Sequence, residues 1–254
     1  MEKSFPYECL ESVDSTNTYL KDRPDLWSQN FYTVRAIRQT AGRGRYGRTW
    51  HSASGNLTFS FVYCRDLPLE ISPITIYAGL ALRKALGRIT GKTIQLKWPN
   101  DVTFKGKKLG GILTEMVKNE NTPAVIFGIG VNLYPDQLPG ELAGSAISLK
   151  EILGSSTVNA LNPDLHPETI LNDIMVDMQE YLQSYQSPLP QNILSEFATY
   201  NDPGFNMVSV FDEDQKVMVK KPYHITGINE RGLLKVVDEH GQVAVINACE
   251  VQPG

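Results

Sequence analysis

The sequence is poor in the residues that build disulfides and metal centres. It has three cysteines, Cys9, Cys64 and Cys249, and four histidines among 254 residues. The cysteines are far apart and odd in number, and neither residue type recurs at the short intervals of zinc ligands. This argues against a disulfide framework and against a zinc site, and we expect a reduced, cytoplasmic compartment.

Two further absences restrict where the protein acts. No run of apolar residues is long enough to span a bilayer, and residues 1–10 contain no apolar segment of signal-peptide length. The net charge of -4 argues against non-specific binding to nucleic acid, which needs a basic surface. A hydrophobic share of 41% and a charged share of 20% instead match an ordinary globular protein. We therefore expect a soluble chain with no membrane and no nucleic-acid partner.

Acidic residues are missing from one long stretch. Between Leu26 and Cys64 there is no Asp or Glu, and residues 38–50 within it hold four arginines and three glycines. In a mildly acidic protein such a basic segment indicates a ligand-binding loop. Its glycines follow the Gly-x-Gly-x-x-Gly pattern of a dinucleotide-binding fingerprint, which requires a helix after it. Residues 57–63 begin a second strand too soon for a crossover helix, so a Rossmann fold is excluded.

The spacing of apolar residues predicts an α+β fold. Apolar runs and alternation predict strands at 31–37, 57–63, 94–98, 109–116 and 123–133. Helical spacing predicts helices at 74–87, over 148–185 with a break at 159–167, and at 191–200. Gly87 is expected to end the first of these helices, and Gly106 is expected to take a positive φ in a turn. The expected architecture is a mixed or antiparallel sheet flanked by helices.

The predicted domain boundary is Asp-Pro-Gly at residues 202–204. Beyond it, residues 207–251 contain short strand patterns at close turn spacing, which is typical of a small β-barrel of SH3-like size. We therefore predict a large domain at 1–203 and a C-terminal SH3-like β-barrel at 204–254.

Two groups of uncharged residues are candidates for ligand contact. Ser15, Thr16 and Asn17 precede a helix pattern, where they would serve as N-caps or would also face a ligand. Gly110 and Gly111 would weaken the strand that contains them unless something approaches its backbone closely. A ligand is one explanation for these glycines, and a β-bulge is the other.

A third group is charged. Its carboxylate, Asp101, is a candidate metal ligand, and its positive side chains are Arg43, Arg45, Arg48, Lys97 and Lys108. This set would suit a nucleotide with its Mg²⁺, because phosphoryl and adenylyl transfer depend on positioning and charge neutralisation. From spacing alone, a solvated charged face is an equal alternative.

Four motifs resemble those of biotin protein ligases. They are Gly-Arg-Gly-Arg-Tyr-Gly-Arg-Thr-Trp at 42–50, Lys-Trp-Pro-Asn-Asp at 97–101, Lys-Leu-Gly-Gly-Ile-Leu-Thr-Glu at 108–115 and Gly-Ile-Gly-Val-Asn at 128–132. The Ser-Thr-Asn at 15–17 is similar to that family's entry motif, whereas related lipoate ligases have an Arg-Arg-x-Ser-Gly-Gly loop. The resemblance covers the whole chain in order. It implies a class II synthetase-like catalytic domain of the biotin/lipoate ligase type, followed by the small barrel.

The resemblance implies a two-step, ATP-dependent reaction. The carboxylate of biotin would attack the α-phosphate of ATP, with Mg²⁺ as the metal, to give biotinyl-5′-AMP and pyrophosphate. A lysine on the biotin carboxyl carrier domain of a biotin-dependent carboxylase would then attack the mixed anhydride, and AMP would leave. No enzyme nucleophile is needed, in agreement with cysteines that lie outside every motif.

The resemblance also implies roles for individual residues. Biotin would contact Ser15, Thr16, Asn17, Gln39, Arg43, Gly44, Arg45, Lys108, Gly110 and Gly111. The nucleotide would contact Arg43, Arg45, Arg48, Trp50, Lys97, Asn100 and Asn132. Trp50 would stack on the adenine, with a place in the core as the alternative. Lys108, Arg45 and Asp101 would be catalytic: Lys108 neutralises charge near the α-phosphate, Arg45 holds the adenylate, and Asp101 binds Mg²⁺ or deprotonates the acceptor lysine.

Further expectations concern mobility, assembly and rival functions. We expect residues 42–50 to order over a bound ligand, because their arginines repel one another and their glycines lose entropy when fixed. Since Ser15 lies so near Met1, we expect a monofunctional ligase without an N-terminal DNA-binding domain. A homodimer through a sheet edge and a monomer are both compatible with the sequence. The rival hypotheses are a lipoate or octanoate ligase and a non-catalytic biotin or nucleotide sensor.

Overall fold

A seven-stranded sheet forms the centre of the computed structural model, which describes residues 5–52, 55–65, 69–118, 123–134, 144–154, 166–212, 217–221, 223–246 and 250–253. The strands are β1 (Tyr7–Val13), β2 (Thr33–Gln39), β3 (Leu57–Cys64), β4 (Gln95–Lys97), β5 (Asp101–Phe104), β6 (Lys107–Lys118) and β7 (Pro123–Val131). Their order is β1-β2-β3-β7-β6-β5-β4. β1 pairs with β2 in parallel, and the other neighbouring pairs are antiparallel. The predicted mixed sheet is confirmed, and the antiparallel β2–β3 pair agrees with the exclusion of a Rossmann fold.

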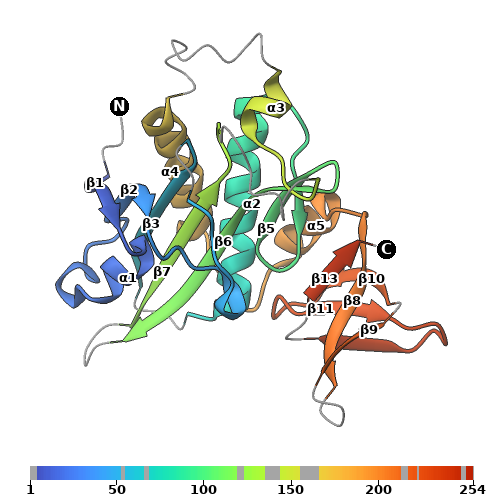
Figure 1. Ribbon diagram of the computed structural model, residues 1–254. Helices are drawn as coiled ribbons and strands as arrows, with labels where there is room; N and C mark the ends of the chain where they lie inside the picture. Colours follow the sequence, from blue (N-terminus) through green and yellow to red (C-terminus); the bar gives the residue numbers. More distant parts are fainter. Residues whose placement is uncertain are drawn as a thin grey trace.

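Helices cover both faces of this sheet. Three longer helices, α2 (Ile71–Thr90), α4 (Pro167–Gln183) and α5 (Gln191–Tyr200), bury the larger core, and Figure 1 shows α2 running behind the strands. Phe59 and Phe61 of β3 point into this core. Val62 points to the opposite face, where Leu20 of the short helix α1 (Thr16–Lys21) packs against it. Because successive side chains of a strand alternate between faces, β3 is buried on both.

The helix α2 continues past its predicted end. Gly87 lies inside the helix, which runs to Thr90, and Gly91 takes the left-handed conformation with φ 63°. Ile89, beyond the predicted end, still packs against the core. Burial of this last turn outweighs the cost of about 1 kcal/mol that an internal glycine imposes. The expected stop at Gly87 was therefore wrong.

The remaining short elements agree with the sequence patterns. Lys105 and Gly106, with φ 51° and 76°, form the predicted turn between β5 and β6. The other short elements are η1 (Pro24–Leu26), η2 (Arg45–Gly47) and α3 (Leu149–Leu153). Ser148 and Glu151 start α3 with reciprocal hydrogen bonds between side chain and backbone. The helical pattern after residue 148 is thus divided into α3 and α4, and residues 155–165 lie outside the described part of the chain.

Two small three-stranded sheets follow α5. They are built from β8 (Phe205–Asp212), β9 (Val217–Lys221), β10 (His224–Ile228), β11 (Leu234–Val237), β12 (Val243–Ile246) and β13 (Glu250–Pro253). Their orders are β10-β11-β12 and β13-β8-β9, with antiparallel pairing throughout, and they lie together at one side of the large sheet (Figure 1). The α+β fold with a small C-terminal β unit is confirmed. Residues 213–216 and 247–249, within the region of the predicted barrel, lie outside the described residues.

The C-terminal β unit packs directly on the large sheet and its helices. Trp98 donates from its indole Nε1 to the carbonyl of Gly232 at 3.0 Å. Leu189 donates from its backbone N–H to the carbonyl of Glu230 at 2.7 Å.

Among the described helices, none is both long and apolar enough to cross a bilayer.

Candidate active site

A cavity of about 830 Å³ lies between the sheet, the start of α1 and the arginine–glycine loop, by which we mean residues 42–50. Of the residues predicted to form the site, all of which the structure describes, every one but Gly110 lines it. These are Ser15, Thr16, Asn17, Gln39, Arg43, Gly44, Arg45, Arg48, Trp50, Lys97, Asn100, Asp101, Lys108, Gly111 and Asn132. Motifs that are far apart in the sequence therefore meet around one space.

The two glycines of β6 serve different purposes. A Cβ on Gly111 would lie 3.1 Å from both Asp101 Oδ1 and Lys108 Nζ, so this glycine makes room for charged side chains at the cavity. A Cβ on Gly110 would lie 2.6 Å from the carbonyl oxygen of Gly130 in the neighbouring strand. Gly110 is needed for the close approach of β6 to β7, and the structure does not bring it to the cavity wall. The contact between Gly110 and the ligand therefore stays a prediction.

The arginine–glycine loop folds as a short hairpin. The backbone N–H of Trp50 donates to the carbonyl of Gly42 at 2.9 Å across its base. A Cβ on Gly42 would lie 2.5 Å from the carbonyl oxygen of Trp50, so no larger residue fits there. At the tip, Tyr46 and Gly47 have φ angles of 57° and 73°. These glycines allow a tight reversal of the chain, and the next described element after the loop is the strand β3.

Arg45 is held against the cavity wall. Its Nη1 donates to Asn100 Oδ1 at 3.2 Å, and its Nη2 donates to the hydroxyl of Tyr46 at 2.9 Å. Asn100 is fixed in turn, because its Nδ2 donates to the carbonyl of Ile112 at 2.8 Å. A guanidinium has five N–H donors, so these bonds leave capacity for a phosphate.

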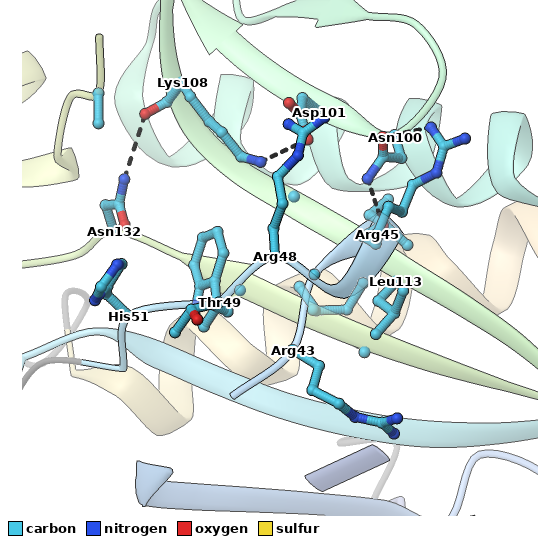
Figure 2. A pocket seen from close by; sticks show the side chains of 18 of the residues that line it. Arg43, Arg45, Arg48, Thr49, His51, Asn100, Asp101, Lys108, Leu113 and Asn132 are labelled. Carbon is cyan, nitrogen blue, oxygen red and sulfur yellow. Dashed lines mark hydrogen bonds and ion pairs between the residues drawn. The ribbon is translucent and has the colours of Figure 1, made fainter. Parts of the chain in front are cut away.

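The other two arginines of the loop point in opposite directions (Figure 2). Arg48 extends toward Asp101 and Lys108, whereas Arg43 extends away from them. Arg43 Nη2 lies 3.4 Å from Glu115 Oε2, in an ion pair. The loop therefore presents cations to both ends of the cavity.

Lys108 and Asp101 form an ion pair with 2.8 Å between Nζ and Oδ1 (Figure 2). The backbone of Lys108 is anchored, because its N–H donates to the carbonyl of Ser145 at 2.9 Å. Its carbonyl accepts from Asn132 Nδ2 at 3.3 Å. The ammonium lies 5.5 Å from the centroid of the Trp50 ring. A cation, a carboxylate and an aromatic ring thus share one wall of the cavity.

Asn132 is buried beside this pair. Its Nδ2 donates to the carbonyl of Ile147 at 3.2 Å as well as to that of Lys108. Both amide hydrogens therefore hold backbone, and Oδ1 is the atom of the amide with capacity for a further partner. Asn132 lines the cavity as predicted, and its hydrogen bonds fix the position of Lys108.

Hydroxyl and amide groups line the opposite end. Thr16 donates from its backbone N–H to Gln39 Oε1 at 2.8 Å, and Gln39 Nε2 donates to Ser52 Oγ at 2.7 Å. Ser15 is the N-cap of α1, yet among the described residues its side chain makes no capping hydrogen bond. Ser15 starts the helix by its backbone conformation, while the residue borders the cavity.

Asn17 has little hydrogen-bonding capacity left. Its Nδ2 donates to Glu115 Oε2 at 2.8 Å and to the carbonyl of Leu113 at 3.3 Å. Its Oδ1 accepts from the hydroxyl of Ser60 at 2.5 Å. With 2% of its surface exposed, Asn17 is better placed to orient its neighbours than to donate to a ligand.

Glu115 carries its charge in a partly buried position. Burial by itself raises the pKa of this carboxyl, but hydrogen bonds from Asn17 and Lys21 and the charge of Arg43 outweigh burial, so the pKa is lowered. Lys21 Nζ lies 3.0 Å from Glu115 Oε1. The group is therefore ionised at neutral pH.

Two glycines of β7 make room for side chains of the site. A Cβ on Gly130 would lie 2.3 Å from Trp50 Cζ2, and one on Gly128 would lie 2.3 Å from Asn17 Oδ1. The Trp50 ring therefore rests on the backbone of β7. Its Nε1 is buried and has no hydrogen-bond partner among the described residues. Because a buried N–H without an acceptor is destabilising, this wall favours a bound ligand over a place for Trp50 in the core.

The C-terminal β unit contributes one aromatic side chain to the cavity. Phe205, the first residue of β8, belongs to its lining. Lys97 Nζ lies 4.5 Å from the centroid of the Phe205 ring. The position of Lys97 therefore depends on both parts of the chain.

A metal ion would find few protein ligands here. Among the described residues there is no group of three or more His, Cys, Asp or Glu side chains that could hold a metal by itself. Asp101 is the one carboxylate among the described lining residues, and it is paired with Lys108. Mg²⁺ is usually bound through one or two carboxylates together with substrate phosphates, so the lining fits a metal that arrives with a nucleotide.

Five residues of the site were missed by sequence reasoning: Glu115, Ser60, Gly128, Gly130 and Phe205. Glu115 ends the motif at 108–115, and both β7 glycines lie within the motif at 128–132, so the motifs contained a signal. Ser60 was visible as a polar residue inside an apolar strand. Phe205 had no such signal, because its contact with Lys97 is formed only by tertiary packing.

Comparison with known proteins shows what the chain is similar to. Residues 9–132, just under half of the chain, match the model of the Biotin/lipoate A/B protein ligase family. The arginine–glycine loop and the Lys108–Asp101 pair both lie within these matched residues.

Individual members of the biotin/lipoate ligase family are similar over different lengths. The bifunctional ligase/repressor BirA of Bacillus subtilis is 42% identical over 126 residues, which cover 48% of this chain and 39% of BirA. The biotin–[acetyl-CoA-carboxylase] ligase of Paracoccus denitrificans is 37% identical over 160 residues, 61% of this chain and 65% of that protein. The chain therefore spans less than two thirds of the length of these curated relatives. The biotin protein ligase of Aquifex aeolicus, solved in complex with biotin and ATP, matches with a TM-score of 0.80 and 27% identity, covering 98% of this chain and 99% of that one.

Proposed function

We propose that this protein is an ATP-dependent biotin protein ligase. It would convert biotin to biotinyl-5′-AMP and then transfer biotin to a lysine of a carrier domain. The observation that carries the proposal is one cavity with hydroxyl and amide groups at one end and cations with a carboxylate at the other. The Aquifex aeolicus relative, which binds biotin and ATP, supports it.

The uncharged end of the cavity suits the ureido head group of biotin. Hydroxyls of Ser15 and Thr16 and the amide of Gln39 can both donate to a ureido oxygen and accept from ureido N–H groups. Gly111 leaves the backbone of β6 open to close approach by the ligand. Asn17 orients this end through its bonds to Ser60 and Glu115.

The cationic end suits the first chemical step. When a carboxylate attacks the α-phosphate of ATP, negative charge accumulates around the phosphorus and on the leaving pyrophosphate. Lys108, Arg45 and Arg48 would stabilise this charge from fixed positions, which is the larger part of catalysis in such transfers. Trp50 would stack on the adenine, and Lys97, Asn100 and Asn132 would contact the nucleotide. Asp101, with Asn100 beside it, would hold Mg²⁺, which neutralises phosphate charge when it is bound.

The second step needs a base. The acceptor lysine must lose a proton before its amine can attack the carbonyl of the anhydride, with AMP as the leaving group. Asp101 is the carboxylate in the described lining, and we assign the proton acceptor role to it. The acceptor would come from the biotin carboxyl carrier domain of a carboxylase, as the name of the Paracoccus denitrificans relative suggests.

We propose further that residues 1–203 form the catalytic domain and residues 204–254 an SH3-like barrel. The change from the large sheet to two small sheets at Phe205 supports this division. The cytoplasm remains the proposed compartment, since neither of the two cysteines that the structure describes forms a disulfide. A homodimer through a sheet edge stays a prediction, which sedimentation velocity would test.

Single-turnover transfer tests the proposal. We expect labelled biotin and ATP to release pyrophosphate and then to label a biotin carboxyl carrier domain. Lys108→Ala should slow pyrophosphate release by about 10²–10³-fold with biotin binding retained. Lys105→Ala, whose exposed side chain is not part of the cavity lining, is the matched control. Pyrophosphate release with lipoate or octanoate instead of biotin would favour the rival ligase, and biotin binding without pyrophosphate release would favour a sensor.

A further inference from the structure

A chain of hydrogen bonds runs beneath the uncharged end of the cavity. It begins at Ser52, just beyond the arginine–glycine loop, which accepts from Gln39 Nε2 at 2.7 Å. Gln39 Oε1 accepts from the backbone N–H of Thr16 at 2.8 Å. Thr16 Oγ1 lies 2.6 Å from the hydroxyl oxygen of Ser60, inside the sheet. The far end of the loop is thus tied to the core of the protein.

The same chain returns to the start of the loop. Ser60 donates to Asn17 Oδ1 at 2.5 Å, and Asn17 donates to Glu115 Oε2 at 2.8 Å. That oxygen is also the partner of Arg43 Nη2 at 3.4 Å. Both ends of the arginine–glycine loop are therefore connected through one set of buried polar groups.

Glu115 is the carboxylate in this chain, and it joins the cation Arg43 to the uncharged groups. Its side chain is 21% exposed, against 36% for Lys21 and 42% for Arg43, so the carboxylate is partly desolvated while its cations reach solvent. Lys21 binds Oε1, and Arg43 shares Oε2 with Asn17. One carboxylate thus serves the loop and the uncharged end of the cavity at once.

We propose that Glu115 is a positioning residue for the arginine–glycine loop. It holds the loop over the cavity through Arg43 and orients Asn17, and through Asn17 the hydroxyls of Ser60 and Thr16. Arg43 points away from the Lys108 end, so it anchors the loop while Arg45 and Arg48 serve the phosphates (Figure 2). The effect on loop position stands by itself, and the effect on catalysis rests on the proposed function.

Proteolysis of the ligand-free protein tests the effect on loop position. Glu115→Gln keeps an acceptor oxygen for Asn17 but removes the charge that holds Arg43. Chymotrypsin cleavage after Tyr46, at the exposed tip of the loop, is the readout, because none of the variants alters that site. The set is Glu115→Gln, Arg43→Gln, the double variant, and Lys21→Gln as the matched control that removes the other cation.

The expected result is non-additive. Each of Glu115→Gln and Arg43→Gln should raise the cleavage rate about five-fold, the factor that corresponds to about 1 kcal/mol. The double variant should cleave no faster than either single variant, and Lys21→Gln should cleave at the wild-type rate. Unchanged cleavage in Arg43→Gln, whose exposed side chain can be replaced without unfolding, would overturn the proposal. Additive effects in the double variant would overturn it as well.

Retention of the adenylate tests the effect on catalysis. Preformed biotinyl-5′-AMP should dissociate faster from Glu115→Gln and from Arg43→Gln by the same factor, with no further increase in the double variant. If the wild-type protein forms no adenylate, the proposed function fails while the proteolysis result stands. If it forms adenylate and the cleavage rates are additive, the role of Glu115 fails alone.

Discussion

At the scale of single residues, the side chains of the cavity are oriented by their neighbours before a ligand arrives. Asn100 holds Arg45, and Asn132 holds the backbone of Lys108. A cation that is already ordered loses less entropy when charge develops beside it. The amides of this site therefore act mainly by fixing the charged groups.

Replacement of Arg45 separates binding from retention. We expect Arg45→Gly to leave biotin binding partly intact, since Arg45 is held at Asn100, far from the Thr16–Gln39 bonds at the uncharged end. The variant should release biotinyl-5′-AMP, because the guanidinium that binds its phosphate is lost. Filter-binding of labelled adenylate measures this, with Arg231→Gly in an exposed turn as the control. Retention as tight as in the wild type would contradict the role of Arg45.

The carboxylate of Glu115 predicts a dependence of stability on pH. In the folded protein the pKa of this carboxyl is lowered from its ordinary value of about 4.5. Ionised Glu115 therefore stabilises the fold at pH values above 4.5, and this contribution is lost as the pH falls through the lowered pKa. Glu115→Gln should therefore cost about 1 kcal/mol of unfolding free energy at pH 7 and much less at pH 3. Urea unfolding across this range measures the difference, and Glu11→Gln on the exposed side of β1 is the control. A difference that grows on acidification would refute the assignment.

At the scale of elements, the site depends on strand β7 as a smooth surface. The absence of side chains at Gly128 and Gly130 lets Asn17 and Trp50 lie directly on its backbone. The arginine–glycine loop, which ends at Trp50, forms a hairpin beside Asn17, and the tip of this hairpin is exposed at Tyr46. Strand and loop are thus matched in shape across the cavity.

Mobility of the loop is expected to change with ligand. The contacts of Arg43 and Arg45 hold the loop in the ligand-free protein, but repulsion between its like charges weakens this conformation, and phosphate supplies the missing countercharge. Trypsin cleavage near Arg43 should therefore slow when biotin plus ATP is added. The cleavage rate should not fall when biotin is added with an excess of chelator. Mass spectrometry of the fragments identifies the site. A cleavage rate that biotin plus ATP leaves unchanged would rule out closure.

A methyl group on β7 should disrupt nucleotide binding. Gly130→Ala places a Cβ 2.3 Å from the Trp50 ring, so we expect the ring to move and the affinity for ATP to fall at least about ten-fold. Gly79→Ala, inside α2, is the matched control. A Cβ at this position makes an ordinary contact of 3.5 Å with Leu96 of β4. That variant should keep the wild-type affinity and gain up to about 1 kcal/mol of stability. Calorimetric titration with ATP distinguishes the two, and equal affinities would refute the role of Trp50.

At the scale of the whole molecule, one core cluster joins the large sheet to the C-terminal β unit. Val208, Leu234 and Val236 from the small sheets belong to the same cluster as the residues of α2 and α4. Phe205 at this junction lines the cavity and faces Lys97. The C-terminal unit therefore shapes the site even though it carries few polar groups in it.

Loss of one hydrogen bond across this junction should affect both stability and nucleotide binding. Trp98→Phe removes the bond to Gly232, and we expect a cost of about 1–3 kcal/mol and a raised KM for ATP, because Lys97 and Phe205 shift. Trp27→Phe is the control, since it removes an equivalent bond to Leu20 at 2.8 Å in the other cluster. Its stability should fall similarly with an unchanged KM. Equal KM values in both variants would contradict a role for the junction.

Much of the site was predictable because local patterns report on local constraints. The motifs at 15–17, 42–50, 97–101, 108–115 and 128–132 contain most of the predicted site residues, and every predicted residue but Gly110 lines the cavity. Gly111 lines the cavity and Gly110 does not, a difference that the two adjacent glycines of the motif do not reveal. The end of α2 was missed at Gly87, because packing of Ile89 overrides a glycine signal.

The sequence by itself determined five of the seven strands of the large sheet, the longer helices and the absence of a crossover helix, because each follows from periodicity, whereas β1 and β5 were not predicted. It also determined most of the residues that meet at the cavity, because they belong to motifs whose chemistry is local. Only the tertiary structure decided which groups are paired there. The link from Glu115 to Arg43, the support of Trp50 by Gly130 and the approach of Phe205 to Lys97 join residues far apart in the chain. Such contacts depend on strand register and on packing between layers, which no spacing along the sequence specifies.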